Sequence, residues 1–508
     1  MATPGELEAL LNITQELDGL KTSVAATNAS VDAFFLCTMA IVIYFMQCGF
    51  AFLEAGAVRS KHTTNILIKN ILDSFIGCIA YYIFGWALAF GEPGNAFCGN
   101  SFWAMAQLSD SKLPLWFFQF VFAATSATIV SGALAERCDF IAYVVYSFLL
   151  TGFVYPIVSH WAWNPIGWLA VGLTAQNGTL VSHYKDFAGS GVVHITGGTA
   201  ALVAAALLGP RINRFDPETG ESRAIPGHSV PLVSLGGFVL FFGFLAFNGG
   251  SQLHIQQAND GAVVANAMVN TVLSGSTGAF TTLLLTRLLR PHWSLLRTIN
   301  GGLAGMVAIC AGCNVLYPWG ACVMGFFAAG SYMAWSELVL AMRIDDPVEA
   351  IAVHYGGGIW GVIGVAFLRR DRGILFYWNT QSGLDLAMQL VGALSITAWS
   401  GVASLIIFGA LRLLKVLRVP PELEIKGMDY PKHGEMAYPL SAYGHGWKED
   451  NAIPEIGFSE IVRPELVISR SHCSSKPAWQ PDTVNGKTID PSSHIGQNGY
   501  ANQGADLI

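Results

Sequence analysis

The dominant pattern along the chain is a series of long apolar runs, separated by short segments that carry charges or are rich in Pro and Gly. A helix needs roughly 20 apolar residues to cross the hydrocarbon core of a bilayer, and eleven runs have this character. They begin near Phe34, Ile71, Pro114, Phe140, Gly191, Val230, Ala262, Leu296, Tyr317, Ala350 and Leu386. The pattern predicts an all-α polytopic membrane protein with eleven transmembrane helices.

An odd number of crossings places the two termini on opposite sides of the membrane. The segment before the first run is acidic, with Lys21 as its single basic residue, so it lacks the basic region of a cleaved signal peptide. Cytoplasmic loops collect Lys and Arg: eleven fall in loops predicted inside, and six fall outside. We therefore expect the N-terminus outside and the C-terminus in the cytosol, with the Arg369, Arg370 and Arg372 cluster as an exception to the charge bias.

Three glycosylation sequons give an independent check on this orientation. They start at Asn12, Asn28 and Asn177, and a glycan is added only on the non-cytosolic side. All three lie in segments predicted to be outside. The two indications agree.

Composition excludes several classes of protein. Of 508 residues, 53% are hydrophobic and 12% are charged, about half the charged fraction of a soluble domain. The net charge of -7 provides no basic surface for nucleic acid. Cys310 and Cys313 form a single CxxC without a second pair of ligands, so we expect packing cysteines and no metal there. We also expect no cofactor and no enzymatic activity.

The chain divides by composition into four parts. We expect an extracellular N-terminal segment at 1–32, a transmembrane domain at 33–415, a cytosolic docking tail at 416–470 and a disordered tail at 471–508. Within the membrane domain, repeat one covers about 33–210, repeat two about 230–370, and helix eleven about 386–414. Five helices per repeat is an odd number, so the second repeat must be inverted relative to the first.

Two histidines occur at matching places in these repeats. His194 follows Asp186 by eight residues and His354 follows Asp346 by eight, and adjacent glycines come soon after each histidine. Inverted repeats bring corresponding helices together near the bilayer midplane. Ionisable residues inside a membrane are candidates for function, and recurrence favours a functional pair over two separate core histidines.

Five colinear segments resemble the Amt/Mep/Rh family of ammonium transporters, and the Amt branch more than the Rh branch. They are GFAFLEAGAVRSKHTTN, FVFAATSATIVSGALAER, DFAGSGVVH, FGFLAFNGGS and DDPVEAIAVHYGGG, within a resemblance from about Phe34 to Tyr438. The resemblance implies eleven helices with inverted five-helix repeats and one pore per subunit of a homotrimer. It also implies ammonium or ammonia as substrate, with methylammonium as an analogue.

The same resemblance assigns roles to individual residues. It implies an outer recruitment site of Trp163, Ser251 and Phe122, and a phenyl gate of Phe122 with Phe247 and with Phe118 beside it. Below the gate it implies a hydrogen-bonded pair of His194 and His354, supported by Asp186. By base rate, Trp163 would be an interfacial anchor and the phenylalanines would face lipid or core, and Asp186 is expected to cap a helix rather than relay a proton.

The implied function is ammonium uptake across the plasma membrane of a eukaryotic cell: recruitment of ammonium, loss of its proton near the gate, and passage of ammonia past the histidines. Two alternatives stay open, an ammonium sensor that signals through its tail and an Rh-like channel for ammonia or carbon dioxide. In the tail segment GMDYPKHGEMAY, Pro431 stands where many plant relatives have a phosphorylated Thr. That phosphorylation switch cannot operate here.

Overall fold

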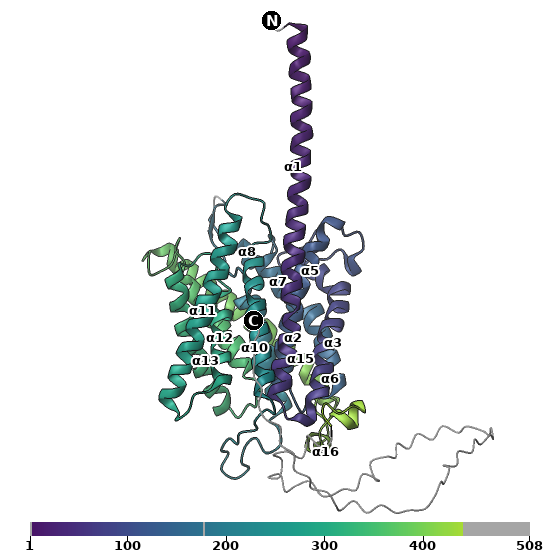
Figure 1. Ribbon diagram of the computed structural model, residues 1–508, viewed down its shortest axis with the longest axis vertical. Helices are drawn as coiled ribbons and strands as arrows, with labels where there is room; N and C mark the ends of the chain where they lie inside the picture. The colour runs from purple at the N-terminus through teal and green to yellow at the C-terminus, as the bar shows by residue number, and fades with distance from the viewer. Residues whose placement is uncertain (1–2, 176–177, 440–508) are drawn as a thin grey trace, which may run out of the picture. The chain divides into compact units, whose positions relative to one another are not determined.

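Long apolar helices make up most of the chain that the computed structural model describes, residues 3–175 and 178–439 (Figure 1). Their order along the chain is α1 (Pro4–Tyr44), α2 (Met46–Ala57), η1 (Ser60–His62), α3 (Thr63–Ala80), η2 (Tyr81–Gly85), α4 (Trp86–Phe90), η3 (Trp103–Met105), η4 (Asp110–Lys112), α5 (Leu113–Ala133), α6 (Phe140–Leu149), η5 (Leu150–Val154), α7 (Tyr155–Trp163), α8 (Trp168–Val171), β1 (Leu173–Thr174), β2 (Leu180–Ser182), η6 (Ser190–Ile195), α9 (Thr196–Leu208), α10 (Val230–Gly250), α11 (Asp260–Leu289), α12 (Leu295–Ile309), α13 (Pro318–Ala341), η7 (Ile351–Gly356), α14 (Gly357–Leu368), α15 (Thr380–Leu413), α16 (Pro421–Lys426) and η8 (Asp429–His433).

Ten continuous helical stretches in the described chain are long and apolar enough to cross a membrane. They account for ten of the eleven predicted helices, so the all-α polytopic membrane class is confirmed. The remaining predicted helix, near Leu296, is α12, which has only 15 residues. At 1.5 Å per residue it is about 22 Å long, short of the roughly 30 Å hydrocarbon core.

The end of α12 is held by the segment that precedes η6. The carbonyls of Cys310 and Ala311 accept hydrogen bonds from the amides of Ala188 (3.0 Å) and Phe187 (3.2 Å). The Ser190 hydroxyl donates to Val307 O at 2.8 Å. These contacts satisfy carbonyls that a helix leaves free at its end. They also bring the chain before His194 against the second half of the bundle.

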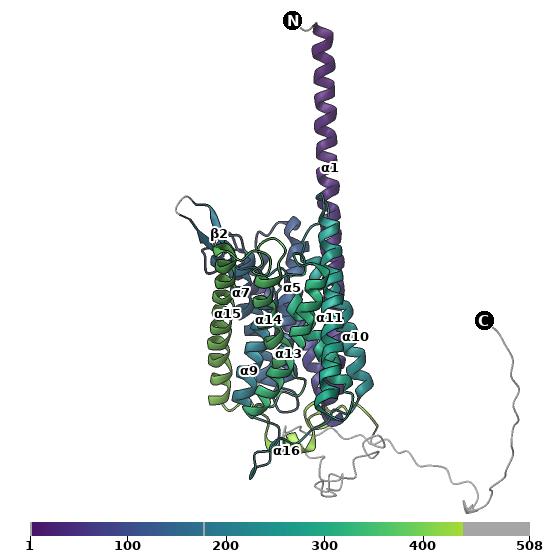
Figure 2. The same ribbon diagram turned by 90° about the vertical axis from the view of Figure 1, so that its left-hand side faces the viewer.

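The first helix extends well beyond the apolar run that it contains. The apolar run starts near Phe34, yet α1 is helical from Pro4, where Thr3 and Glu6 form a reciprocal capping box and Pro4 occupies the first turn. Asn12 is exposed and Asn28 half-buried on this helix, whereas Asn177 lies outside the described residues. Both views show the outer part of α1 and the β1–β2 hairpin at one end of the bundle and α16 at the other (Figures 1 and 2).

At the α16 end, a cluster of buried charges joins four connections between helices. Glu136 pairs with Arg59 and Arg211, and Asp345 pairs with Arg211 and Arg214. Burial disfavours ionisation of Glu136, but the nearby positive charges, foremost that of Arg211, lower its pKa to about 2. The cluster is therefore ionised at neutral pH.

The described part of the tail packs on this same end. Asp429 accepts the Asn65 amide at 2.9 Å, and the Met428 amide donates to Lys61 O at 3.1 Å. Glu424 accepts the Ile212 amide at 2.7 Å. Pro431 is exposed within η8. The contacts join the tail to its own chain; the predicted tail at 471–508 lies outside the described residues.

The arginine cluster that departs from the charge bias has partners in the structure. Arg369 bonds the Asp371 carboxylate (2.6 and 2.8 Å) and lies 3.6 Å from Asp385 on α15, while Arg372 lies 3.5 Å from Asp385. Arg372 also donates to Val181 O in β2 at 3.2 Å. The cluster thus links the α14–α15 connection to α15 and to the β hairpin.

Candidate functional site

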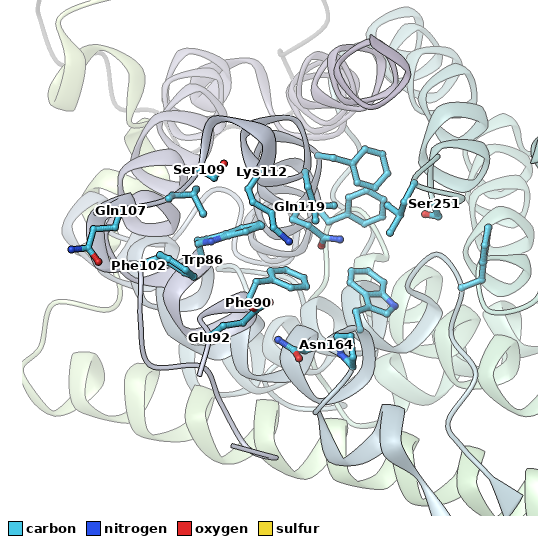
Figure 3. Close-up of a pocket in the computed structure, with 18 residues that line it drawn as sticks. Trp86, Phe90, Glu92, Phe102, Gln107, Ser109, Lys112, Gln119, Asn164 and Ser251 are labelled. Carbon is cyan, nitrogen blue, oxygen red and sulfur yellow. The ribbon is translucent and has the colours of Figure 1, made fainter. Parts of the chain in front are cut away.

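A cavity of about 450 Å³ opens at the same end of the bundle as the β hairpin, between α4, α5, α7 and the end of α10 (Figure 3). Its lining includes four of the residues singled out from the sequence: Trp163, Ser251, Phe122 and Phe118. They come from three helices far apart along the chain. The proposed recruitment residues therefore meet in one space.

Hydrogen bonds orient the polar groups of this cavity. The Trp163 indole N–H donates to Asp186 O at 2.7 Å, so the ring is held in place. The Ser251 hydroxyl donates to Phe247 O at 2.8 Å. Because its only hydrogen is used, the Ser251 oxygen presents lone pairs to any further partner. The cavity thus offers an aromatic ring and a hydrogen-bond acceptor.

Phe122 lines the cavity, and its ring packs on that of Phe247. The ring centroids of Phe122 and Phe247 are 4.1 Å apart with an interplanar angle of 30°, and both side chains are buried. Phe118 packs beside Phe122 at 4.9 Å, and Trp163 meets Phe122 edge-on at 5.7 Å. The rings separate the cavity from the residues beneath them.

The two histidines lie directly below these rings. Nδ1 of His194 is 3.1 Å from Nδ1 of His354, and the rings are nearly parallel at 17°. The His194 ring is 5.6 Å from Phe247 and 5.7 Å from Phe244. A hydrogen bond between two Nδ1 atoms needs one donor and one acceptor, so the rings are different tautomers when both are neutral.

Both histidines lie in π-helical turns, His194 in η6 and His354 in η7. Each turn follows an acid that bonds the free amides of the helix start. Asp186 accepts from Gly189 (3.0 Å), Gly191 (2.8 Å) and Val192 (2.9 Å), and Asp346 accepts from Ile351 (2.7 Å). Acceptors at a helix start satisfy amides that have no intrahelical partner. Their geometry is that of helix caps.

The structure adds residues that the sequence did not single out. Gln119 lines the cavity and is buried, and its amide oxygen accepts no hydrogen bond from the described residues. Phe244 stacks on His194, and Cys310 Sγ lies 3.8 Å from His194 Nε2. Nothing in the local sequence distinguishes Gln119 from a lipid-facing polar residue, because its direction depends on how α5 is packed.

The wider rim of the cavity carries charges that the sequence analysis did not assign to the path. Glu92 and Lys112 both line it and are both exposed. Exposed charges act through a high dielectric and are screened by salt. The buried residues of the lining include Gln119 and Phe122, which are uncharged.

Below His354 lies a small cavity of about 20 Å³, lined by Phe50, Glu54, Asn300 and His354 among others. This is room for about one water-sized molecule. The Glu54 carboxylate is buried and accepts hydrogen bonds from Ser131 and from Asn70 (2.8 Å). A carboxyl group therefore lines the far side of the histidine pair.

The two cysteines of the CxxC are buried at the end of α12. Cys310 donates to Met306 O at 3.1 Å and Cys313 is buried nearby. In the part of the chain that the structure describes, no three His, Cys, Asp or Glu side chains converge in the manner of a metal site.

Comparison with known proteins gives the family to which the chain is similar. The model of the Ammonium Transporter Family matches residues 33–438. The chain is 50% identical over 459 residues to putative ammonium transporter 1 of Caenorhabditis elegans, covering 86% of this chain and 85% of that protein. It is 41% identical to ammonium transporter 1 member 2 of Oryza sativa subsp. japonica, covering 78% and 84%.

Solved structures agree with the fold. A structure titled Sensor Amt Protein superposes with a TM-score of 0.74 at 30% identity, covering 80% of this chain and all of that one. The structure of Candida albicans Mep2 superposes with a TM-score of 0.69 at 24% identity, covering 77% and 87%. The family match and these relatives show that the chain is a multi-pass membrane protein of the Ammonium Transporter Family.

Proposed function

We propose that this ammonium transporter recruits ammonium in the outer cavity, removes a proton at the phenyl gate and conducts ammonia past His194 and His354. The observation that carries the proposal is a continuous series of ring contacts from cavity to histidines: Trp163 to Phe122, Phe122 to Phe247, Phe247 to His194 and His194 to His354.

The cavity suits a small cation that donates hydrogen bonds. A cation over an aromatic face gains about 0.5–2 kcal/mol, most with Trp. The oxygens of Ser251 and Gln119 are acceptors without competing donors in their described surroundings. Trp163, Phe122 and Ser251 form the recruitment site in this proposal, with Gln119 as an additional acceptor.

Selection follows from the uncharged gate, which among the described residues consists of the rings of Phe122, Phe247 and Phe118. Moving a bare ion into a low-dielectric medium costs on the order of tens of kcal/mol by Born reckoning. Potassium cannot avoid this cost, whereas ammonium can leave a proton behind and continue as ammonia. Beyond the gate of Phe122 and Phe247, flanked by Phe118, the imidazoles can accept or donate a hydrogen bond to neutral ammonia.

We extend the proposal to the architecture. His194 and His354 occupy equivalent π-helical turns after equivalent acids, which supports inverted repeats with eleven crossings, α12 among them. The proposal includes an outside N-terminus, a cytosolic tail, a plasma-membrane location and a homotrimer with one pore per subunit. Asp186 acts as the structural support of the first histidine.

Purified full-length protein in liposomes tests the mechanism. Adding ammonium should produce a change of internal pH, and a current if the proton crosses as well. His194→Ala should change methylammonium uptake, and Trp163→Leu should lower uptake at low concentration by roughly tenfold, since about 1.4 kcal/mol corresponds to tenfold. Trp103→Leu, at an exposed tryptophan outside the cavity, is the control. Unchanged uptake in both site variants would exclude the assigned pore.

A sensor is the main alternative, and the structural similarity to a protein titled Sensor Amt Protein favours testing it. Deletion of residues 456–508 in cells that depend on the protein separates the two functions. A sensor would lose signalling and keep transport. An Rh-like gas channel is disfavoured by the cation-binding groups Trp163 and Ser251, and saturable transport with a current would exclude it.

A further inference from the structure

In the described part of the chain, residues 4–31 of α1 are almost entirely exposed and project from the bundle (Figures 1 and 2). Residues 4–31 span about 40 Å at 1.5 Å per residue, and both views show them extending away from the bundle (Figures 1 and 2). Asp32, just below, accepts the Ile255 amide of the α10–α11 connection at 2.8 Å. Above that anchor, large apolar side chains are exposed, including Leu10 (57%), Leu17 (47%) and Leu20 (62%).

These side chains follow the repeat of a coiled coil. The positions at alternating steps of three and four are Leu10, Ile13, Leu17, Leu20, Val24, Thr27, Val31 and Phe34. Seven of the eight are apolar, which is the a and d pattern of a heptad sustained over almost four heptads. Neither sequon asparagine, Asn12 nor Asn28, falls on this stripe. Asn12 is at a c position, away from the stripe, whereas Asn28 is at an e position beside Thr27 and borders it.

Charge placement fits a parallel partner of the same sequence. Glu16 directly precedes the core position Leu17, and Lys21, five residues after Glu16, directly follows the core position Leu20. These are the g and e positions that face each other between neighbouring strands of a parallel coiled coil. Lys21 is exposed and lies 3.5 Å from Asp18 of its own helix, a pairing that leaves its ammonium group accessible. The opposite charges of Glu16 and Lys21 complement each other across such an interface.

The stripe also continues into the membrane part of the same helix. Phe34, Ile41 and Phe45 lie on the continuation of the a and d positions and are exposed on the surface of the chain. From Leu10 to Phe45 the a and d positions are apolar except at Thr27 and Thr38. Lipid can cover the lower part of this stripe, but the part above Asp32 extends beyond the apolar layer.

We propose that the outer parts of α1 from several copies of this chain pack together as a parallel coiled coil on the outer face of the membrane. Copies inserted in one membrane with one orientation present parallel helices, as the heptad charges require. The inference rests on the outside N-terminus and the homo-oligomer of the proposed function, with three strands in a trimer. It does not rest on the route of ammonium.

Cysteine substitution in the full-length protein in cell membranes tests the coil. Leu20→Cys at a core position should give a disulfide-linked dimer under mild oxidation, at least fivefold more abundant than for Thr22→Cys on the opposite face. Wild-type protein supplies the background of the native cysteines. Equal bands for the two variants, or no band for Leu20→Cys, would overturn the coil.

A second arm tests the role of the apolar stripe. In a Val24→Cys background, Leu17→Glu with Leu20→Glu should abolish the dimer band, whereas Gln15→Glu with Thr22→Glu adds the same charge off the stripe and should leave it. Equal loss in both would contradict packing through the stripe. Mass in detergent and methylammonium uptake, measured in parallel, show separately whether the oligomer and the transport proposal stand.

Discussion

Ser251 illustrates how one hydrogen bond determines whether a side chain can still donate or only accept another. Its O–H group is donated to Phe247 O, so only acceptor lone pairs remain for the cavity. A serine with a free hydroxyl would serve either role. The bond makes the oxygen suited to ammonium, which has only donors.

Ser251→Ala removes that acceptor and should weaken binding of methylammonium more than maximal transport. Losing a hydrogen bond at a half-exposed site costs about 1 kcal/mol, which corresponds to a roughly fivefold increase in the KM of uptake. Ser109→Ala, in the rim of the same cavity and bonded to Ser111 at 2.9 Å, is the matched control. An equal increase in KM for the two variants would argue against a specific role for Ser251.

Asp186 is the residue whose structural role is best supported by geometry. It accepts three amides at the start of η6 and is buried, whereas Asp346 is half-buried at the start of η7. Removing a cap of this kind costs about 2 kcal/mol. Asp186→Ala should lower the apparent Tm in detergent by several degrees, and Asp346→Ala by less.

Asp186→Asn separates capping from proton relay. The amide keeps one acceptor oxygen, so it should restore part of the lost Tm. A variant with restored Tm but no transport would favour the relay that the sequence analysis considered second.

At the scale of elements, buried charges at the α16 end connect segments that are distant in sequence. Glu136 after α5 holds Arg59 and Arg211, and Asp345 after α13 holds Arg211 and Arg214. In the sequence, these arginines contribute to the charge bias that predicts the cytosolic side. In the structure, they form ion pairs with Glu136 and Asp345 that link the helix connections of the two halves.

Glu136 predicts a pH dependence of stability. Its pKa is about 2 in the folded protein, below its ordinary value of about 4.5, so its ionised form stabilises the fold above pH 4.5 and loses that contribution as pH falls toward 2. The difference amounts to about 3 kcal/mol. The apparent Tm should hold from pH 7 to 5 and then decrease.

Glu136→Gln should lower Tm at pH 7 and flatten the decrease below pH 4.5 relative to wild type. Both are measured by thermal unfolding in detergent. Parallel Tm curves for the two proteins across this pH range would show that Glu136 does not titrate with folding.

At the scale of the whole molecule, the glycosylation sequons provide a test of the side of the membrane on which the N-terminus lies. If the N-terminus is outside, N-glycosidase treatment of protein from a eukaryotic host should increase its gel mobility. Changing Asn12, Asn28 and Asn177 together to Gln should remove the shift, while Asn100→Gln, at an outer-loop asparagine without a sequon, should keep it. A shift that persists in the triple variant would place the glycan elsewhere.

The sequence alone determined the membrane class, ten of the helices long enough to cross the bilayer, and the family. These follow from local patterns. Bilayer thickness sets the length of an apolar run, and colinear family motifs can be recognised in the sequence without knowledge of how the helices pack. The apolar run predicted near Phe34 lies within α1, but hydrophobicity gave no signal for the helix that precedes it, which begins at the capping box of Thr3 and Glu6.

Only the tertiary structure decided which side chains meet. His194 and His354 are 160 residues apart and 3.1 Å from each other. The repeat predicted their proximity and the family resemblance implied their hydrogen bond, but neither predicted the π-helical turns in which both histidines lie. The unpartnered oxygen of Gln119, the stack of Phe244 on His194 and the partners of Arg369 had no local signal. The direction of a side chain in a bundle depends on helix rotation and packing, which residues distant in sequence determine together.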